Sequence, residues 1–375
     1  MVNSNGCTFV FYMKLLFYRL GNLKSAAVAS HSCTVVSLRG FLAAVLILLF
    51  ALPSAAQDST KAQTANTNAQ PLPNTKGLYI QYPESSIQNP TTYPYNKKRV
   101  RLVTAGNIIG YGSTLIGFYG AWYKNYPQTN FHSFNDSREW LQVDKLGHLY
   151  GAYVGGSASM EMWRWTGIGR KKRIWLGGLS GVAYQTVIET LDGFSKGWGW
   201  SWSDMGANVL GSGLVIGQEL AWDEQRIRIK FSVHRRSYGD AELNQRANSL
   251  YGKGSAERFI KDYNAQTYWA SVNLRSFFPK SRLPRWLNVA VGYGAEGMFG
   301  AEANVGTAEN GNITFNRPDI KRYRQWFIAP DIDLTKIPTK KKGVRLLLGV
   351  LNAFKFPAPS LEFGNGKVRV NGVHF

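Results

Sequence analysis

Three segments place acidic, basic and imidazole side chains at spacings that suit chemistry. In Asp144-Lys145-Leu146-Gly147-His148, the carboxylate and the imidazole are four residues apart and share one face of a helix. Two further segments, 189–193 and 201–208, carry carboxylates and an amide three or four residues apart. Together the segments offer seven candidate site residues: Asp144, Lys145, His148, Glu189, Asp192, Asp204 and Asn208.

These residue types are typical of general acid/base catalysis. His148, oriented by Asp144, can act as the acid or base, with Glu189, Asp192 or Asp204 as the second carboxylate. A histidine with carboxylates can also ligate zinc or manganese, but with one histidine in the set we predict no metal and no cofactor. The chain has no phosphate-binding loop, no Gly-x-Ser-x-Gly elbow and no His-Glu-x-x-His. We therefore favour a function other than catalysis.

A structural role is the alternative for each residue. Asp144 can cap a helix N-terminus, Ser201 and Asp204 have the spacing of a capping box, and Asp192-Gly193 can end a helix. Burying several acids beside one lysine and one histidine is costly unless they pair. The group is therefore either a polar network that holds helices together or a site.

The elements that must position these residues are helices rich in small residues. Glycine costs up to about 1 kcal/mol at each site in an isolated helix, but it allows helices to approach closely. In an up-down bundle the three segments meet at one end, and the linker brings Trp198, Trp200 and Trp202 there as candidate binding residues. We expect a Gly-rich four-helix bundle, embedded in or lying against a membrane, with helices at 102–123, 144–165, 174–192 and 203–222.

The three helical motifs resemble a known family. The patterns DKLGH at 144–148, ETLDGFS at 189–195 and WGWSWSDMGAN at 198–208 are similar to the YfiM-like predicted periplasmic lipoproteins, domain of unknown function 2279. The stretches KDYNAQTYWAS, WLNVAVGYGAEGM and DIDLTKI resemble the longer Bacteroidetes members, and the likeness spans residues 96–375. The Asp-Lys…His helix start is more distantly similar to VanZ-like membrane proteins. The resemblance implies an envelope protein without an established activity.

From residue 226 onward, apolar residues recur at every second position, as in strands, and no longer at the spacing of a helix. Alternating runs at 226–234, 268–274, 287–294 and 324–334, and a final run at 367–375, predict about six antiparallel strands, with a helix near 344–354. Apolar residues alternate with small or polar ones, and the chain ends in an aromatic residue, which resembles outer-membrane β-barrel proteins. A half-buried sheet on a soluble core gives the same alternation. Pro330 predicts an edge or a bulge.

The N-terminal region has the features of an export signal. The uncharged run 41–52 follows Arg39 and precedes Ser54 and Ala56, the small residues expected before a cleavage site. The stretch upstream of this run is over-long for a signal peptide. No cysteine follows the run, in contrast to a lipoprotein; Cys7 and Cys33 both precede it. We expect location in the periplasm or outer membrane, with the inner membrane as the alternative.

The net charge of +21 predicts an anionic partner. Export argues against nucleic acid, so anionic lipid or an envelope polymer is expected. The predicted organisation is a signal peptide at 1–56, a flexible leader at 57–96, a helical bundle at 97–224 and a β-rich domain at 225–375, an α+β fold. We predict that the protein associates with a membrane and has a binding or a structural role there. The alternatives are an envelope enzyme acting on a lipid or glycan and an envelope assembly scaffold.

Overall fold

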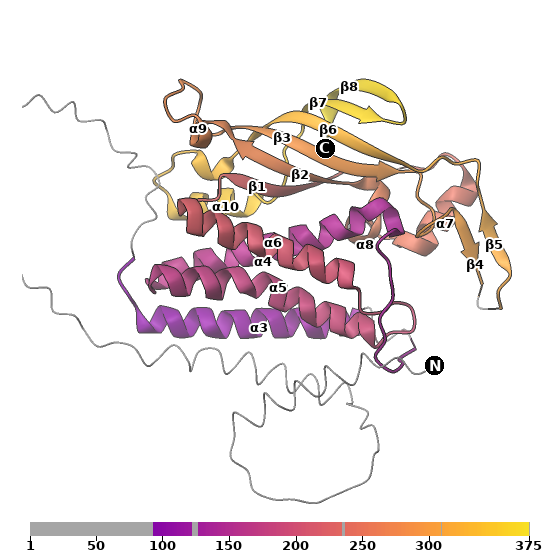
Figure 1. The fold of residues 1–375 in the computed structure, drawn as a ribbon, viewed down its shortest axis with the longest axis horizontal. Helices are drawn as coiled ribbons and strands as arrows, with labels where there is room; N and C mark the ends of the chain where they lie inside the picture. The colour runs from indigo at the N-terminus through magenta and orange to yellow at the C-terminus, as the bar shows by residue number, and fades with distance from the viewer. Residues whose placement is uncertain (1–92, 122–126, 235–236, 309, 375) are drawn as a thin grey trace, which may run out of the picture. The chain divides into compact units, whose positions relative to one another are not determined.

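The computed structural model describes residues 93–374, except 122–126, 235–236 and 309. The predicted signal peptide and nearly all of the predicted leader lie outside the described residues. Within the described residues the fold is α+β, as the sequence predicted, with helices preceding an antiparallel sheet (Figure 1).

The helical half contains α3 (Lys97–Ala121), α4 (Val143–Thr166), α5 (Arg170–Gly193) and α6 (Trp202–Trp222). Each lies where a helix was predicted. α4, α5 and α6 pack on one another, and α3 lies against α4 and stacks Tyr111 on Tyr184 of α5. In the described part of the chain, no helix combines the length and the apolar character needed to cross a membrane.

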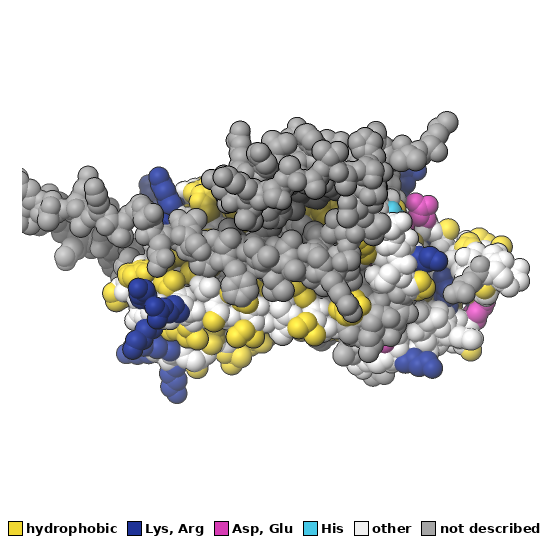
Figure 2. All heavy atoms as spheres, turned by 90° about the horizontal axis from the view of Figure 1, so that it is seen from below, with side chains coloured by type: hydrophobic (Ala, Val, Ile, Leu, Met, Phe, Trp, Pro, Cys, Tyr) yellow, Lys and Arg dark blue, Asp and Glu magenta, His cyan; other side chains and the backbone are white. Residues whose placement is uncertain are grey.

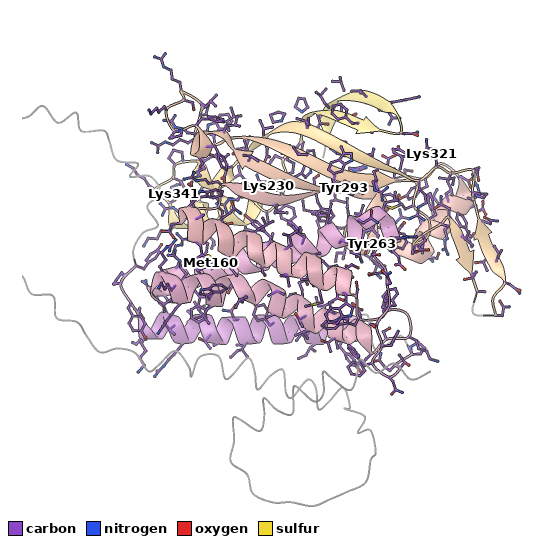
Figure 3. The ribbon with its side chains drawn as sticks, viewed as in Figure 1. Met160, Lys230, Tyr263, Tyr293, Lys321 and Lys341 are labelled. Carbon is purple, nitrogen blue, oxygen red and sulfur yellow. The ribbon has the colours of Figure 1, made fainter. Side chains whose placement is uncertain are left out.

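Glycines let α4, α5 and α6 approach closely. A Cβ atom at Gly181 of α5 would lie 2.0 Å from the carbonyl oxygen of Ala152 in α4, and one at Gly211 of α6 would lie 2.2 Å from that of Leu149. The small residues of the sequence therefore mark the helix contacts. Between them lies an apolar layer that includes Met160 (Figure 3), Ile174 and Val215.

The second half is a six-stranded antiparallel sheet in the order β1-β2-β3-β6-β7-β8, open with β1 and β8 at its edges. The strands are β1 (Ile227–Val233), β2 (Gln266–Asn273), β3 (Leu287–Glu296), β6 (Tyr323–Ile332), β7 (Ala358–Gly364) and β8 (Lys367–His374). All but β7 were predicted. The pairing of β6 with β7 stops at Ile328, two residues before Pro330, which has no N–H to donate.

Shorter elements complete the fold. The helix α10 (Lys342–Leu351) was predicted, whereas α7 (Ala241–Tyr251), α8 (Ser255–Lys261), α9 (Leu274–Phe277) and the hairpin β4 (Val305–Thr307) and β5 (Ile313–Asn316) were not. These missed elements are too short or too polar to show a clear period.

The two faces of the sheet differ as the alternation predicted. On the face toward α4, Phe231 and Tyr268 pack on Val143 and Tyr150. The other face is buried as well, and it carries the aromatic residues Trp269 and Phe327 beside small and polar residues. There the ammonium of Lys230 lies 2.8 Å from Asp331, which also accepts a hydrogen bond from Ser271 at 2.6 Å.

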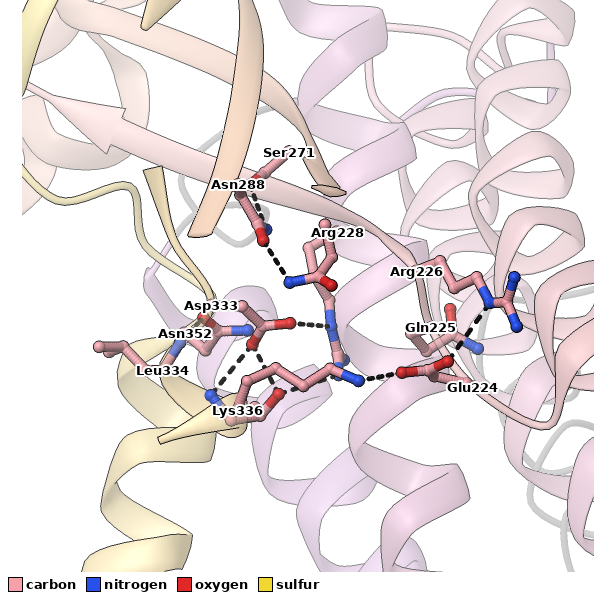
Figure 4. A network of polar contacts seen from close by, with 12 residues as sticks. Glu224, Gln225, Arg226, Arg228, Ser271, Asn288, Asp333, Leu334, Lys336 and Asn352 are labelled. Carbon is pink, nitrogen blue, oxygen red and sulfur yellow. Dashed lines mark hydrogen bonds and ion pairs between the residues drawn. The ribbon is translucent and has the colours of Figure 1, made fainter. Parts of the chain in front are cut away.

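Charged residues join the end of the bundle to the sheet (Figure 4). Lys336 pairs with Glu224, just after α6, and Arg228 of β1 lies 3.8 Å from the buried carboxylate of Asp333. Asn352, at the end of α10, accepts a hydrogen bond from the backbone of Leu334 at 2.9 Å. These contacts tie α6, β1 and α10 together.

The glycine contacts make a test of the helix packing. Gly181→Ala should lower the free energy of unfolding by about 1–3 kcal/mol, because the new methyl group meets the α4 backbone. Gly213→Ala in α6 meets nothing within 4 Å and should raise stability by up to about 1 kcal/mol. Urea unfolding measures both changes. Equal effects of the two substitutions would contradict the close α4–α5 contact.

Candidate functional site

A cluster of charged side chains lies at one end of the bundle, where α4 begins, α5 ends and α6 begins. Lys145 is at its centre, with its side chain 11% exposed. The ammonium nitrogen lies 2.5 Å from Asp136, 3.0 Å from Asp144 and 2.7 Å from Asp204. One cation therefore holds carboxylates from α4, from α6 and from the segment before α4.

Serines at the start of α6 complete the surroundings of Asp136. Ser201 and Ser203 each donate a hydrogen bond of 2.6 Å to the same oxygen of Asp136. The Ser201 hydroxyl also accepts a bond from the backbone N–H of Asp204, so it is the N-cap of α6. Ser201 therefore caps α6, but the second bond of a capping box is absent, because the backbone N–H of Ser201 donates to Oε2 of Glu189 at 3.2 Å. Asp144 is not the N-cap of α4, which is Gln142.

The two ring nitrogens of His148 face different carboxyl groups. Nδ1 lies 3.4 Å from Oε1 of Glu189, whose side chain is 1% exposed. Nε2 lies 4.0 Å from Oδ1 of Asp144 and 3.8 Å from Oδ2 of Asp204. The ring therefore stands between a buried acid of α5 and two acids that Lys145 also contacts.

The start of α4 is fixed by an unusual turn. Trp140, Leu141 and Gln142 all have positive φ values, which L-residues seldom adopt in succession. Tyr293 of β3 (Figure 3) donates a hydrogen bond of 2.5 Å to the Leu141 carbonyl, and Arg324 donates one of 2.6 Å to the Gln142 side chain. The sheet thus stabilises the turn that places Asp144 and Lys145.

Tyr263 supplies a second contact from the β-rich half. Its hydroxyl donates a hydrogen bond of 2.7 Å to Oδ1 of Asp144, the oxygen that faces His148. Its ring packs on Trp140, near the end of the bundle where the cluster lies (Figure 3). Asp144 is therefore oriented from both sides, by Lys145 and by Tyr263.

The carboxyl groups of the cluster differ in acidity. Burial disfavours the charged form of Asp136, but hydrogen bonds from Lys145, Ser201 and Ser203 outweigh burial and lower its pKa to about 2. Burial of Asp144 is likewise outweighed, by the charges of His148 and Lys145, and its pKa is lowered. The two groups are ionised at neutral pH.

The two remaining acids hold their protons more strongly. Burial, with the nearby charge of Asp204, raises the pKa of Glu189 to about 9. Burial and the charge of Asp144 raise the pKa of Asp204 to about 7, although His148 and Lys145 act in the opposite direction. Perturbed acids beside a histidine are typical of functional sites, and they also occur in structural ion networks.

Three of these residues have donor atoms that could share one ion. One ligand atom each from Asp144, His148 and Asp204 lies within 4.8 Å of the others. The same arrangement allows a proton to pass between His148 and either carboxylate after a small movement. The geometry thus allows both ion binding and acid/base chemistry.

Most of the candidates predicted from the sequence meet at this end of the bundle. The structure brings five of them together: Asp144, Lys145, His148, Glu189 and Asp204. The charge of Asp192 helps to raise the pKa of Glu189. Asn208 is fully buried in α6, four residues after Asp204, and its Nδ2 lies 3.9 Å from the sulfur of Met205; its part in the site stays a prediction.

The tryptophans lie beside the cluster residues in sequence but make contacts of their own. The rings of Trp200 and Trp202 pack edge to face, and Trp200 also packs on Phe131. Trp202 is strongly exposed although it starts α6. A binding role for Trp198, Trp200 and Trp202 stays a prediction.

Sequence reasoning missed Asp136 and Tyr263. Asp136 lies in an irregular segment before α4, and Tyr263 is 119 residues from its partner Asp144. Neither residue belongs to a periodic pattern. Only the KDYNAQ segment, noted for its resemblance, pointed to the region of Tyr263.

Comparison with known proteins supports the expected resemblance over part of the chain. Residues 133–217 match the family model described as predicted periplasmic lipoprotein (DUF2279). The match covers α4, α5 and most of α6, and it contains every cluster residue except Tyr263. No curated protein and no solved structure shows a significant similarity to the chain.

The match places the chain among exported proteins of the periplasm or outer membrane, as the N-terminal region predicted. The family description assigns no activity. The role of the chain therefore has to be argued from its own structure.

The central ion contacts make a second test. Lys145→Met should lower the free energy of unfolding by about 3–5 kcal/mol, because it leaves several buried carboxylates without their cation. Lys171→Met, at an exposed position of α5, should change stability by less than about 0.5 kcal/mol. Denaturant unfolding measures both. A Lys145 variant as stable as the Lys171 variant would contradict the central role of Lys145.

Proposed function

We propose that this cell-envelope protein associates with a membrane by docking an apolar band of its sheet on an anionic lipid surface. The band consists of two rows of side chains that cross strands β3, β6, β7 and β8. The first row is Val291, Ile328, Leu361 and Val370, and the second is Tyr293, Trp326, Phe363 and Val368.

The carrying observation is that the side chains of each row are paired in register and face outward, apart from Tyr293, which packs toward α4. Ile328 pairs with Val291 on one side and with Leu361 on the other, and Leu361 pairs with Val370. All of these side chains except Tyr293 are exposed, with Val370 reaching 77%. Scattered exposed apolar residues are normal, but a contiguous band indicates an interaction surface.

A groove adds to the apolar character of this face. It is lined by Val289, Ile328, Pro330, Leu361 and Val370, where β6 and β7 separate beyond Ile328. Its apolar lining suits a hydrocarbon chain better than a polar polymer. This supports lipid rather than glycan as the contacted material.

Basic residues supply the electrostatic part of the proposal. Exposed Lys340, Lys341 (Figure 3), Lys342 and Arg345 lie at the start of α10, next to the exposed apolar residues Leu346, Leu347 and Val350. A helix with one apolar face and basic neighbours is typical of membrane-surface binding. Further lysines and arginines gather at one end of the bundle, beside exposed hydrophobic side chains (Figure 2). Each such cation near an anionic surface contributes about 1 kcal/mol.

A vesicle-binding experiment tests the proposal. The mature protein should float with phosphatidylglycerol-containing vesicles and bind neutral phosphatidylcholine vesicles much more weakly. Ile328→Glu combined with Leu361→Glu should weaken binding by about tenfold or more, because it removes apolar contact and adds negative charge.

Ile313→Glu is the control, since Ile313 is also apolar and is more exposed than Ile328, but lies in the separate β4–β5 hairpin. It should leave vesicle binding unchanged. Equal loss in both variants, or binding that persists in the double variant, would overturn docking through the band. Self-association that the double variant abolishes without any vesicle binding would instead assign the band to a second copy of the chain.

The second candidate function is an envelope enzyme acting on a lipid or glycan. The position of His148 between Glu189 and the two aspartates favours it. In this case the His148→Asn variant should fold and bind vesicles normally, but it should fail to restore the wild-type phenotype when expressed in a deletion strain. Loss of folding in this variant would support the network interpretation, and full complementation would exclude a catalytic His148. The assembly-scaffold alternative stays a prediction that crosslinking to a protein partner would support.

A further inference from the structure

We infer that Asp144, His148 and Asp204 form a binding site for one divalent transition-metal ion, of the zinc or manganese type. This inference concerns the bundle end and does not depend on docking of the sheet. It also departs from the expectation from the sequence, which predicted no metal because the cluster has one histidine.

The first argument is the spacing of the donor atoms. Nε2 of His148 lies 4.0 Å from Asp144 Oδ1 and 3.8 Å from Asp204 Oδ2, and one donor atom from each of the three residues lies within 4.8 Å of the other two. These separations are too long for hydrogen bonds. Ligands about 2.1 Å from one zinc ion lie roughly 3.4 Å apart at a tetrahedral angle, so a small contraction would bring all three atoms onto one ion.

The second argument comes from Glu189, which is independent of the three ligands. Its buried Oε1 has no hydrogen bond within the described residues and lies 3.4 Å from Nδ1 of His148. When Nε2 of a histidine binds a metal, Nδ1 carries the ring proton and usually donates it to a carboxyl or carbonyl oxygen. Glu189 stands where that acceptor is required.

The third argument is that other residues already orient the ligands. Lys145 contacts Oδ2 of Asp144 and Oδ1 of Asp204, which leaves the opposite oxygen of each carboxylate toward His148. Tyr263 fixes Asp144 from the sheet side. Three carboxylates, including Asp136, face a single ammonium, so the group has an excess of negative charge that a cation offsets.

The ligand types indicate which ion fits. One imidazole nitrogen with two carboxylate oxygens suits zinc or manganese, whereas calcium and magnesium prefer oxygen alone. Three protein ligands leave at least one coordination position for water. His148 and Asp144 are each partly exposed, so solvent and a small ligand can reach the ion.

Isothermal titration of the mature protein with zinc chloride, and separately with manganese chloride, tests the site. We expect one ion per chain with a dissociation constant of about 10 μM or tighter, and a rise in melting temperature that grows with ion concentration. Calcium and magnesium should bind at least about tenfold more weakly.

Conservative variants locate the ion. His148→Gln, Asp144→Asn and Asp204→Asn should each weaken binding by at least tenfold and remove the ion-dependent rise in melting temperature. Glu189→Leu, which removes the acceptor for Nδ1, should keep the stoichiometry and weaken binding by about 10–100-fold, as expected for a residue that supports a ligand. Glu161→Gln, an exposed acid on α4, and His132→Gln are the controls and should bind as the unchanged protein does.

The inference is overturned if neither ion binds, or if binding survives in the His148 and Asp204 variants. It is also overturned if the His132 control loses binding as they do, since that would indicate a surface histidine. Should a ligand variant not fold, as judged by circular dichroism, the Glu189→Leu variant and the calcium comparison still decide the question. None of these outcomes bears on vesicle binding, so the two proposals can fail separately.

Discussion

The structure of the bundle end depends on one ammonium group surrounded by carboxylates. Lys145 contacts Asp136, Asp144 and Asp204, which come from the segment before α4, from α4 itself and from α6. Buried carboxylates are costly unless they are paired, so these three positions can coexist only with the lysine between them. The consequence reaches α5, because fixing α4 and α6 places His148 against the buried carboxyl of Glu189.

The β-rich half contributes to this arrangement more than its distance in sequence suggests. Tyr263 orients Asp144, and Tyr293 and Arg324 hold the left-handed turn from which α4 begins. A turn with three consecutive residues at positive φ is unfavourable by itself and persists where its surroundings over-determine it. The sheet therefore supports the cluster as well as presenting its own surface, and the two halves act as one unit at this end of the bundle.

The sheet combines a buried polar set with an exposed band of apolar side chains. Lys230, Ser271 and Asp331 are buried and bonded to one another, while Val291, Ile328 and Leu361 face outward. Burying polar groups is costly unless they pair, and here the ion pair with Lys230 and the bond from Ser271 both satisfy Oδ2 of Asp331. Exposing the apolar rows is unfavourable in water and becomes favourable only against another apolar surface, which is the basis for the proposed docking on lipid.

The sequence by itself determined the α+β class, the positions of α4, α5 and α6 and five of the six strands of the large sheet, because these follow from local period and composition. The predicted start of α5 was wrong, since the helix begins at Arg170 and not at residue 174. It also indicated that Asp144, Lys145, His148, Glu189 and Asp204 meet, since helix spacing and an up-down path bring them to one end. It did not place Asp136, Tyr263 or the turn at 140–142, whose roles arise from contacts between segments up to 182 residues apart. It also predicted that Asn208 takes part in the cluster, and this stays a prediction for a buried amide whose nitrogen lies near the sulfur of Met205. Only the tertiary structure decided which oxygen of each carboxylate faces Lys145 and which faces His148, because that choice depends on how α4 and α6 pack on each other.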